Sequence, residues 1–527
     1  MLLLLLTMIV SEKESSGGFW QSKRAVLAIS FAALLIAAYT TDAVGVPVHD
    51  YARGSIGGTP YQSIWYMNAF LIPAALTMPL VGNLKIRYGA KRLAIIGPGI
   101  FGLALFGESL ATTSSILIFM RIMQGLGAGV IPATVGGYLG GGIGEKHIKL
   151  GKGILVIALA IGASSGISFG GLVTWYFNWR ATFAVLGTLV LTAVSLIIKL
   201  MPDDRGNPEE KIDWQTFLLM AGGFGLLSIS LTIGNQQEWF QSSIYVITLW
   251  TSIVFIGLFV WRMTTRPKLI NPLIFKDVNY CISITNLTLI LFFVFIIFGI
   301  LPVFMLKVIG NTIGSYSLPF IPLILCSVLI VYITTPGISP CLIAKTTRQQ
   351  KILASFGILG FAITTLWMAH TNMSQSNENI TLQLALIGAF FGLIIIEVQM
   401  CFKTMPPNLM VSASSVLFFC TNIAKALSGG VSGAIVTASS QGSWDRFREQ
   451  INSTNSSLEG YLAAIGDKSF GGITDNWSAA SLELIHQVAS KEVLVISYIN
   501  LTTMTGVVLL FLSLLPLLHR DAKVVLK

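Results

Sequence analysis

Two neighbouring apolar segments decide how the rest of the chain is interpreted. They read RIMQGLG at 121–127 and GASSGISFGG at 162–171, both within the stretch from Ile116 to Trp175. A charged side chain at membrane depth is costly and usually faces a bundle interior or a water-filled cavity. Glycines at every fourth residue give a helix one flat face that a neighbouring backbone can approach closely. The first segment therefore predicts a buried charge and the second a tightly packed surface, a combination typical of membrane proteins whose helices move.

The composition places the whole chain in a membrane. Of its 527 residues, 54% are hydrophobic and 11% are charged, whereas a soluble domain has roughly 25% charged residues. Apolar stretches of about 20 residues recur, which is long enough to cross a bilayer as a helix. The alternating pattern of barrel strands is absent, and helices satisfy their own backbone groups in hydrocarbon. The predicted fold class is an all-α polytopic membrane protein.

We predict fourteen transmembrane helices, arranged as two six-helix bundles plus two additional helices. Their limits are 25–46, 62–83, 93–111, 115–138, 152–173, 179–200, 213–234, 243–263, 280–305, 318–338, 350–369, 380–402, 410–438 and 493–518. The domains are then a cytoplasmic tail at 1–24, an N-terminal bundle at 25–202, a linker with the additional pair at 203–278, and a C-terminal bundle at 279–527. The last bundle contains an external loop at 439–491, in which 482–493 is compatible with a helix.

The basic residues give the orientation, because cytoplasmic loops carry an excess of lysine and arginine. With the N-terminus inside, most of the 33 Lys and Arg fall in loops and tails on the cytoplasmic side. The net charge of +10 is then a topology signal beside anionic lipid, and both termini are predicted to be cytoplasmic, at the inner (cytoplasmic) membrane. No basic patch with interleaved aromatic residues is present, so nucleic acid is not an expected partner.

Three features bear on the start of the chain, cofactors and catalysis. The opening MLLLLLTMIV is too short to span a membrane and lacks a basic start, which leaves Met1 and Met8 as alternative starts. The cysteines and histidines are scattered, so neither a disulfide framework nor a metal site is expected, and no phosphate-binding loop predicts ATP use. An enzyme acting on lipid would need acids or histidines clustered at an interface. We therefore expect a protein that is not an enzyme and has no cofactor.

Four stretches carry a family resemblance. The segment at 82–92 is similar to the signature G-x-L-x-D-R-x-G-R-K, 121–127 to R-x-x-Q-G-x-G, 162–171 to a fifth-helix antiporter signature, and 422–433 to N-x-x-R-x-x-G-G. These are motifs of the major facilitator superfamily, and together they resemble its fourteen-helix drug:proton antiporters of the EmrB/QacA type. The resemblance assigns gating or helix packing to Gly82, Arg87, Gly89, Lys91, Arg92, Gln124, Gly125, Gly162, Gly166, Gly170, Gly171, Gly429 and Gly433.

The resemblance also implies a function. Two bundles would rock about a central site and export amphipathic or cationic toxic compounds in exchange for protons. A periplasmic adaptor and an outer-membrane channel would be the partners in a host with two membranes. Ile86 stands where the first signature has its aspartate, so we expect gating to use other contacts. Ile167 replaces a proline of the antiporter signature, which keeps open a carrier for one metabolite such as a siderophore, in either direction.

Proton coupling requires an acid whose protonation changes as access alternates, because burial favours the neutral carboxyl and a nearby cation favours the carboxylate. The candidates inside predicted spans are Asp42, Glu108 and Glu397. We favour Asp42, tuned by Arg121; the alternative is that Asp42 lies in the headgroup zone and caps a helix end. Glu108 and Glu397 are predicted to lie near the two membrane interfaces. Lys425 either takes part in coupling or extends outward to water.

Overall fold

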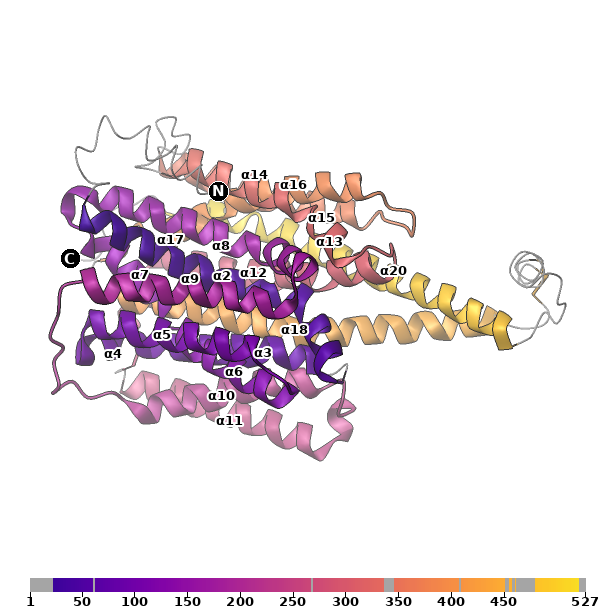
Figure 1. The fold of residues 1–527 in the computed structure, drawn as a ribbon, viewed down its shortest axis with the longest axis horizontal. Coiled ribbons are helices and arrows are strands. Elements are labelled where there is room, and N and C mark those ends of the chain that lie inside the picture. Colours follow the sequence, from indigo (N-terminus) through magenta and orange to yellow (C-terminus); the bar gives the residue numbers. More distant parts are fainter. Residues whose placement is uncertain are drawn as a thin grey trace.

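The structure, a computed structural model, describes residues 22–59, 62–266, 269–335, 346–406, 409–450, 455–456, 460 and 479–520. The predictions for the tail before residue 22, for the choice between Met1 and Met8, and for the middle of the external loop lie outside these residues. Within them every regular element is a helix, as the all-α prediction requires (Figure 1).

The N-terminal bundle contains six predicted spans, two of which are divided into shorter helices. Its elements are α2 (Lys23–Ile56), α3 (Gln62–Thr77), η2 (Met78–Leu80), α4 (Val81–Tyr88), α5 (Ala90–Ser109), α6 (Ser114–Ala128), α7 (Ile131–Gly137), η3 (Tyr138–Gly142), η4 (Glu145–His147), α8 (Ile148–Tyr176) and α9 (Trp179–Leu200). Pro79 in η2 and Pro132 at the start of α7 lie at the two divisions. Proline has no backbone N–H to donate, so it favours a break in the regular helix.

The additional pair and the C-terminal bundle follow. Their elements are α10 (Trp214–Ile233), η5 (Trp239–Gln241), α11 (Ser243–Thr265), η6 (Pro272–Lys276), α12 (Val278–Lys307), α13 (Ile313–Ser317), α14 (Phe320–Thr334), α15 (Thr347–Met368), α16 (Asn377–Ile394), α17 (Ile396–Cys401), α18 (Met410–Gln450), α20 (Ala479–Leu512) and η7 (Leu515–Leu518). In Figure 1 α10 and α11 lie together along one edge, where α10 packs against α3 and α18.

Thirteen helices in the described part of the chain are long and apolar enough to cross a membrane. They correspond to the first twelve predicted spans and the last. The remaining prediction, 410–438, corresponds to α18, which carries Asn422 and Lys425 and packs against α12, α20, α3 and α10. The fourteen-helix prediction is therefore consistent with the fold, with α18 as the most polar member.

Two predicted boundaries are wrong. The first span was expected to end at residue 46, but α2 continues through Pro47 to Ile56. Helix α18 was expected to end at residue 438 but continues to Gln450. Helix α20 begins at Ala479, which confirms the helix expected at 482–493, so both ends of the external loop are helical. Figure 1 shows these two helix ends projecting side by side beyond the bundle, and the rings of Trp444 and His486 stack between them with centroids 5.1 Å apart.

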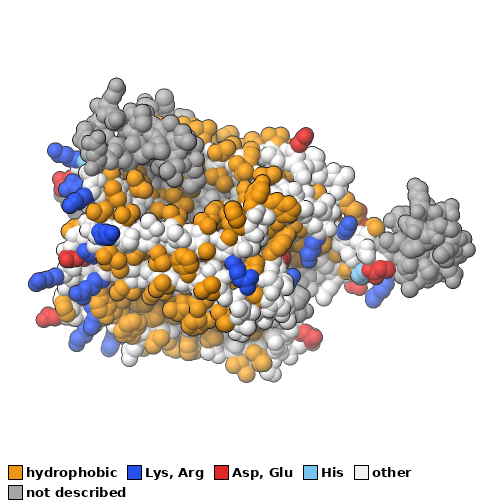
Figure 2. All heavy atoms as spheres, in the orientation of Figure 1, with side chains coloured by type: hydrophobic (Ala, Val, Ile, Leu, Met, Phe, Trp, Pro, Cys, Tyr) orange, Lys and Arg blue, Asp and Glu red, His pale blue; other side chains and the backbone are white. Residues whose placement is uncertain are grey.

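Charge is distributed unevenly along the bundle. On the face drawn in Figure 2, lysine and arginine gather at the end opposite to the projecting helices, and hydrophobic side chains cover the sides. The same end holds the α4–α5 junction and the segment that connects α9 to α10 (Figure 1). The loops that the sequence predicts to be cytoplasmic thus share one end of the molecule.

Candidate functional site

An ion pair joins the two bundles at the centre of the molecule. Lys425 Nζ on α18 lies 2.6 Å from Asp42 Oδ2 on α2 and donates a second hydrogen bond, 3.1 Å long, to Asn422 Oδ1. The rings of Tyr39 and Phe295 each lie 5.1 Å from the ammonium. Asp42 is 8% exposed and Lys425 is 4% exposed. The sequence separation of 383 residues means that only the tertiary fold brings the two charges together.

The position of this pair bears on the alternatives that the sequence left open, a helix-capping role for Asp42 and an outward-extended side chain for Lys425. Asp42 lies in the middle of α2, which extends to Ile56, so its side chain does not cap a helix end. The Lys425 side chain does not extend outward, because its ammonium is buried against Asp42. Removing one partner of a buried ion pair lowers the free energy of unfolding by about 3–5 kcal/mol, because the other charge is left uncompensated.

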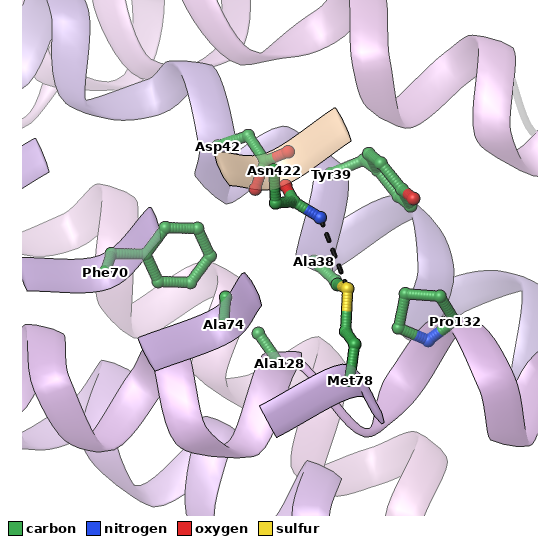
Figure 3. A pocket seen from close by; sticks show the side chains of 9 residues that line it. All are labelled: Ala38, Tyr39, Asp42, Phe70, Ala74, Met78, Ala128, Pro132 and Asn422. Carbon is green, nitrogen blue, oxygen red and sulfur yellow. Dashed lines mark hydrogen bonds between the residues drawn. The ribbon is translucent and has the colours of Figure 1, made fainter. Parts of the chain in front are cut away.

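A small cavity adjoins the ion pair. It has room for no more than about one water molecule and is lined from both bundles (Figure 3) by Ala38, Tyr39, Asp42, Phe70, Ala74, Met78, Ala128, Pro132 and Asn422. The Asn422 amide lies 3.4 Å from Met78 Sδ, across the boundary between α18 and η2. The lining combines one carboxylate, one phenol and one amide with apolar and aromatic surface. Carboxylates and aromatic faces attract cations, but a drug-sized compound needs a cavity of about 300–1,000 Å³, so the site is closed in this conformation.

A second polar cluster lies in the N-terminal bundle around Arg121, which has no exposed surface. Its Nε donates to the backbone oxygen of Tyr66 at 2.9 Å, and its Nη1 donates to Gln124 Oε1 at 2.8 Å. Its Nη2 lies 2.9 Å from His49 Nε2 on α2. Helices α2, α3 and α6 therefore converge on a single guanidinium.

Glu108 on α5 completes this cluster. Its Oε1 lies 3.6 Å from Arg121 Nε, and its Oε2 accepts a hydrogen bond from the Gln124 amide. Glu108 is fully buried, and its Oε1 has no hydrogen-bond partner. Hydropathy suggested a position near the interface, but the side chain points into the bundle. Among the described residues no ion pair joins Arg121 to Asp42, whose partner is Lys425.

His49 is the member of this site that the sequence analysis missed. Asp42, Gly45 and His49 are spaced by three and four residues, so they lie on one face of α2. A Cβ at Gly45 would lie 2.3 Å from His49 Cε1 and 2.9 Å from Arg121 Nη2, so glycine is required for this approach. The spacing was visible in the sequence, but the predicted helix ended at residue 46, before His49.

Glu397 lies in a separate cluster in the C-terminal bundle. Its Oε1 accepts a hydrogen bond from Asn286 Nδ2 at 3.3 Å, and its Oε2 lies 3.8 Å from His519 Nε2. The same histidine nitrogen is 2.8 Å from Ser283 Oγ. Glu397 is fully buried, and it does not line the cavity beside Asp42.

The first signature forms the junction between α4 and α5, and the α9–α10 linker is bound to it. The Asp204 carboxylate accepts hydrogen bonds from the backbone N–H groups of Ala90 and Lys91, the latter at 2.9 Å. Gly89 has φ +87°, and a Cβ there would lie 2.9 Å from Asp204, so both backbone conformation and space require glycine. Lys91 Nζ lies 2.7 Å from Asp203, and hydrogen bonding to that ammonium, together with its charge, lowers the pKa of Asp203.

The rest of the junction is held through backbone groups. Arg87 Nη1 donates to the backbone oxygen of Glu210 at 2.8 Å, and the N–H of Asn207 donates to the backbone oxygen of Ile86 at 2.8 Å. The Ile86 side chain, which replaces the aspartate of the signature, is 52% exposed. Arg92 is exposed, and Gly82 lies in α4 and is partly buried. We call the contacts of 203–210 with 86–91 the linker clasp.

The glycines of α8 serve two surfaces. Gly162, Gly166 and Gly170 face α2; a Cβ at Gly166, for example, would lie 2.6 Å from the Thr40 backbone oxygen. Gly171 faces the C-terminal bundle, where a Cβ would lie 1.8 Å from a serine hydroxyl of α13. The stripe thus packs one bundle internally, and its last glycine lies where the two bundles touch.

The other predicted glycines differ in how closely they are packed. A Cβ at Gly125 would lie 2.4 Å from the Phe70 backbone oxygen on α3. On α18 a Cβ at Gly429 would meet nothing within 4 Å, and one at Gly433 would lie 3.3 Å from an amide of Asn235. The close approach of α18 to α10 occurs instead at Gly430.

Comparisons with known proteins agree with this architecture. The sequence model described as Major Facilitator Superfamily matches residues 28–429. The chain is 25% identical over 439 residues to the probable multidrug resistance protein EmrY of Escherichia coli K12, covering 78% of this chain and 81% of that protein. It is 22% identical over 398 residues to the multidrug export protein EmrB of the same organism, covering 73% and 74%. A shorter match, 27% over 222 residues and 41% and 44% of the two chains, is to the methyl viologen resistance protein SmvA of Salmonella typhimurium.

Proposed function

This chain belongs to the major facilitator superfamily, and from that premise we propose that it exports amphipathic or cationic toxic compounds in exchange for protons. The relatives named for multidrug export and methyl viologen resistance support this substrate class. The observation that carries the proposal is the buried Asp42–Lys425 pair, which joins the two bundles beside a cavity. The activity is transport, with no chemical change of the substrate.

Asp42 can serve both substrate and proton. As a carboxylate it holds Lys425 in the closed conformation, and it can attract a cationic substrate once the bundles separate, the cavity widens and the contact with Lys425 is broken. When a proton neutralises Asp42, both attractions weaken, because a neutral carboxyl has no net charge for a cation to pair with. A substrate cation and a proton therefore compete for the same group, which is the requirement for exchanging one for the other.

The same pair connects binding to movement. Asp42 lies on α2 and Lys425 on α18, so any separation of the bundles at this point breaks their contact. Neutralising Asp42 lowers the cost of that separation. Glu108 and Arg121 lie beside this path within the N-terminal bundle, and we assign them a supporting electrostatic role.

The gate at the basic end uses the linker clasp. The aspartate of the first signature is absent, and the carboxylates of Asp203 and Asp204 lie against the same junction. We propose that the clasp stabilises the arrangement of α4 and α5, as the motif acid would in a relative that has one. Gly89, which provides the space for Asp204, is part of this gate.

The clustering of basic residues supports an orientation in the inner membrane with both termini on the cytoplasmic side. In that orientation the projecting ends of α18 and α20 lie outside the cell membrane. In a host with two membranes, a periplasmic adaptor and an outer-membrane channel would complete the export route. Labelling of single cysteines by an impermeant reagent in intact cells tests the orientation: a cysteine at 449 should react and one at 209 should not.

The test of function is efflux of ethidium from energised cells that express the chain, with and without a protonophore. We expect protonophore-sensitive efflux that is lost in Asp42→Asn and strongly reduced in Arg121→Ala. Asp50→Asn is the matched control, because Asp50 lies on the same helix but its side chain is 50% exposed, with an ion pair to the nearby Arg53 and a hydrogen bond from Ser63. Full efflux by Asp42→Asn would remove that residue from the mechanism. Transport of a siderophore without any dye movement would favour a carrier for one metabolite.

A further inference from the structure

We propose that His49 is a positioning residue for Arg121, which holds the guanidinium in place while the imidazole is neutral and releases it when the imidazole is protonated. The proposal rests on the proposed proton-coupled export and adds a residue to it. His49 is 3% exposed and lies on α2 two turns beyond Asp42.

The geometry determines which imidazole nitrogen carries the proton. Arginine has only donors, so its Nη2, 2.9 Å from His49 Nε2, must donate to that nitrogen. Nε2 is then an unprotonated acceptor, and the ring is neutral with its proton on Nδ1. A protonated ring would have a donor at both nitrogens, which removes the hydrogen bond and places two positive charges in contact.

The remaining contacts of Arg121 show where it would move. Its Nε and Nη1 donate to neutral oxygens, while its charged neighbour Glu108 remains at 3.6 Å with Oε1 unpartnered. The guanidinium is therefore held away from full contact with the carboxylate. Once His49 no longer accepts a hydrogen bond, the free oxygen of Glu108 is the nearest strong acceptor that the structure offers to Arg121.

His49 lies one residue from an exposed part of α2, so only a short opening of the bundle would bring it to water. The next residue on α2, Asp50, is exposed and bonds Ser63, whereas Asp42 lies two turns deeper. Among the described residues, the other charged or titratable groups near this point are Tyr66 on α3, Glu108 on α5, Arg121 on α6 and Arg180 on α9. The lysines and arginine at 91, 92, 149, 152 and 199 lie at the opposite ends of α5, α8 and α9. Tyr66 presents its ring edge to the imidazole at 5.4 Å, and Arg180 is bonded to the backbone oxygen of Ala111 at 3.0 Å.

The experiment uses the full-length protein reconstituted in liposomes, with ethidium efflux driven by a fixed pH difference across a series of absolute pH values. His49→Gln keeps an acceptor for Arg121 but cannot be protonated, and His49→Ala loses both properties. Burial and the adjacent guanidinium both disfavour a charged imidazole, so we expect the wild-type rate to change about tenfold below about pH 6, under the range over which an exposed histidine changes charge. His49→Gln should change less than about twofold over the same acidic interval while binding ethidium with wild-type affinity, and His49→Ala should be slow throughout.

Three further variants separate positioning from general damage. Gly45→Ala places a methyl group between His49 and Arg121 and should alter the pH profile, whereas Gly54→Ala on the same helix meets open space and should not. His370→Gln controls for loss of an exposed histidine. A pH profile of His49→Gln that coincides with the wild type overturns this inference and leaves the proposed function standing. Absence of proton-coupled efflux in the wild type overturns both.

Discussion

The ion pair between Lys425 and Asp42 yields the most quantitative prediction. Lys425→Ala removes the ammonium and leaves the Asp42 carboxylate buried beside apolar and aromatic side chains. Both side chains are at most 10% exposed and the charged atoms are 2.6 Å apart, so the value for a buried pair applies. The expected loss of unfolding free energy is about 3–5 kcal/mol.

A variant that removes both charges tests whether the loss of unfolding free energy comes from the unpaired charge left on Asp42. In Asp42→Asn with Lys425→Met, neither charge remains and the volumes are similar, so most of the lost stability should return. The free energies come from unfolding titrations in detergent micelles for the wild type, both single variants and the double variant. The comparison pair is Arg53–Asp50 on the same helix, with side chains 26% and 50% exposed and 3.5 Å apart. Breaking this pair should cost less than about 1 kcal/mol.

Two results would refute this reasoning. If Lys425→Ala costs no more than Asp50→Ala, the pair does not hold the bundles together. If the double variant, in which Met keeps the bulk of the lysine stem and no charge remains, is as unstable as Lys425→Ala, the loss does not come from the charge left on Asp42; a Lys425→Met single variant that is as stable as the wild type would assign the loss in Lys425→Ala to packing of the stem. Ethidium efflux measured on the same variants should be low in all three, because each removes the group or the partner on which exchange depends.

The other predictions concern the gate and the contact between bundles. Asp204→Ala should open the linker clasp and raise amide hydrogen exchange at Lys91 several-fold; unchanged exchange would show that the clasp is not formed. The wild-type clasp should weaken in acid, because Lys91 holds the pKa of Asp203 below its ordinary value. This contact is present above the unfolded pKa and is lost as pH falls through the lower folded value, measurable by NMR as titration of the Asp203 carboxyl carbon; titration at the ordinary pKa would contradict the contact. Gly171→Leu should abolish efflux through collision with α13, while Gly429→Ala, which meets open space, should transport normally; equal activities would contradict the assigned contact.

Sequence reasoning recovered the fold because hydropathy and charge act along the chain. Helix α9 runs from Trp179 to Leu200, which are the limits predicted for the sixth span from the hydrophobic pattern. Hydropathy reports how deep a residue lies along the membrane normal, but it does not report the direction of its side chain. For this reason the sequence placed Glu108 near the end of its helix, where α5 does end at Ser109, but could not show that Glu108 and Glu397 are both fully buried in polar clusters.

The site was only partly accessible from the sequence for a related reason. Asp42, Arg121 and Lys425 could be selected because a charge inside an apolar segment is unusual. Their partners depend on the packing of distant helices, so neither the Asp42–Lys425 pair nor the approach of His49 to Arg121 could be assigned. The role of Asp204 was hidden because acids in a polar linker ordinarily contact only water.

The linker clasp also changes how the two bundles are mechanically connected. With 203–210 fastened to the α4–α5 junction, only 211–213 remain as slack between the N-terminal bundle and α10. The additional pair is thereby kept on a short tether to the first bundle. Relative rotation of the bundles must then be absorbed mainly in the other connection, between α11 and α12, which contains the short helix η6. Stiffening the α11–α12 connection should therefore slow transport more than stiffening the α9–α10 linker.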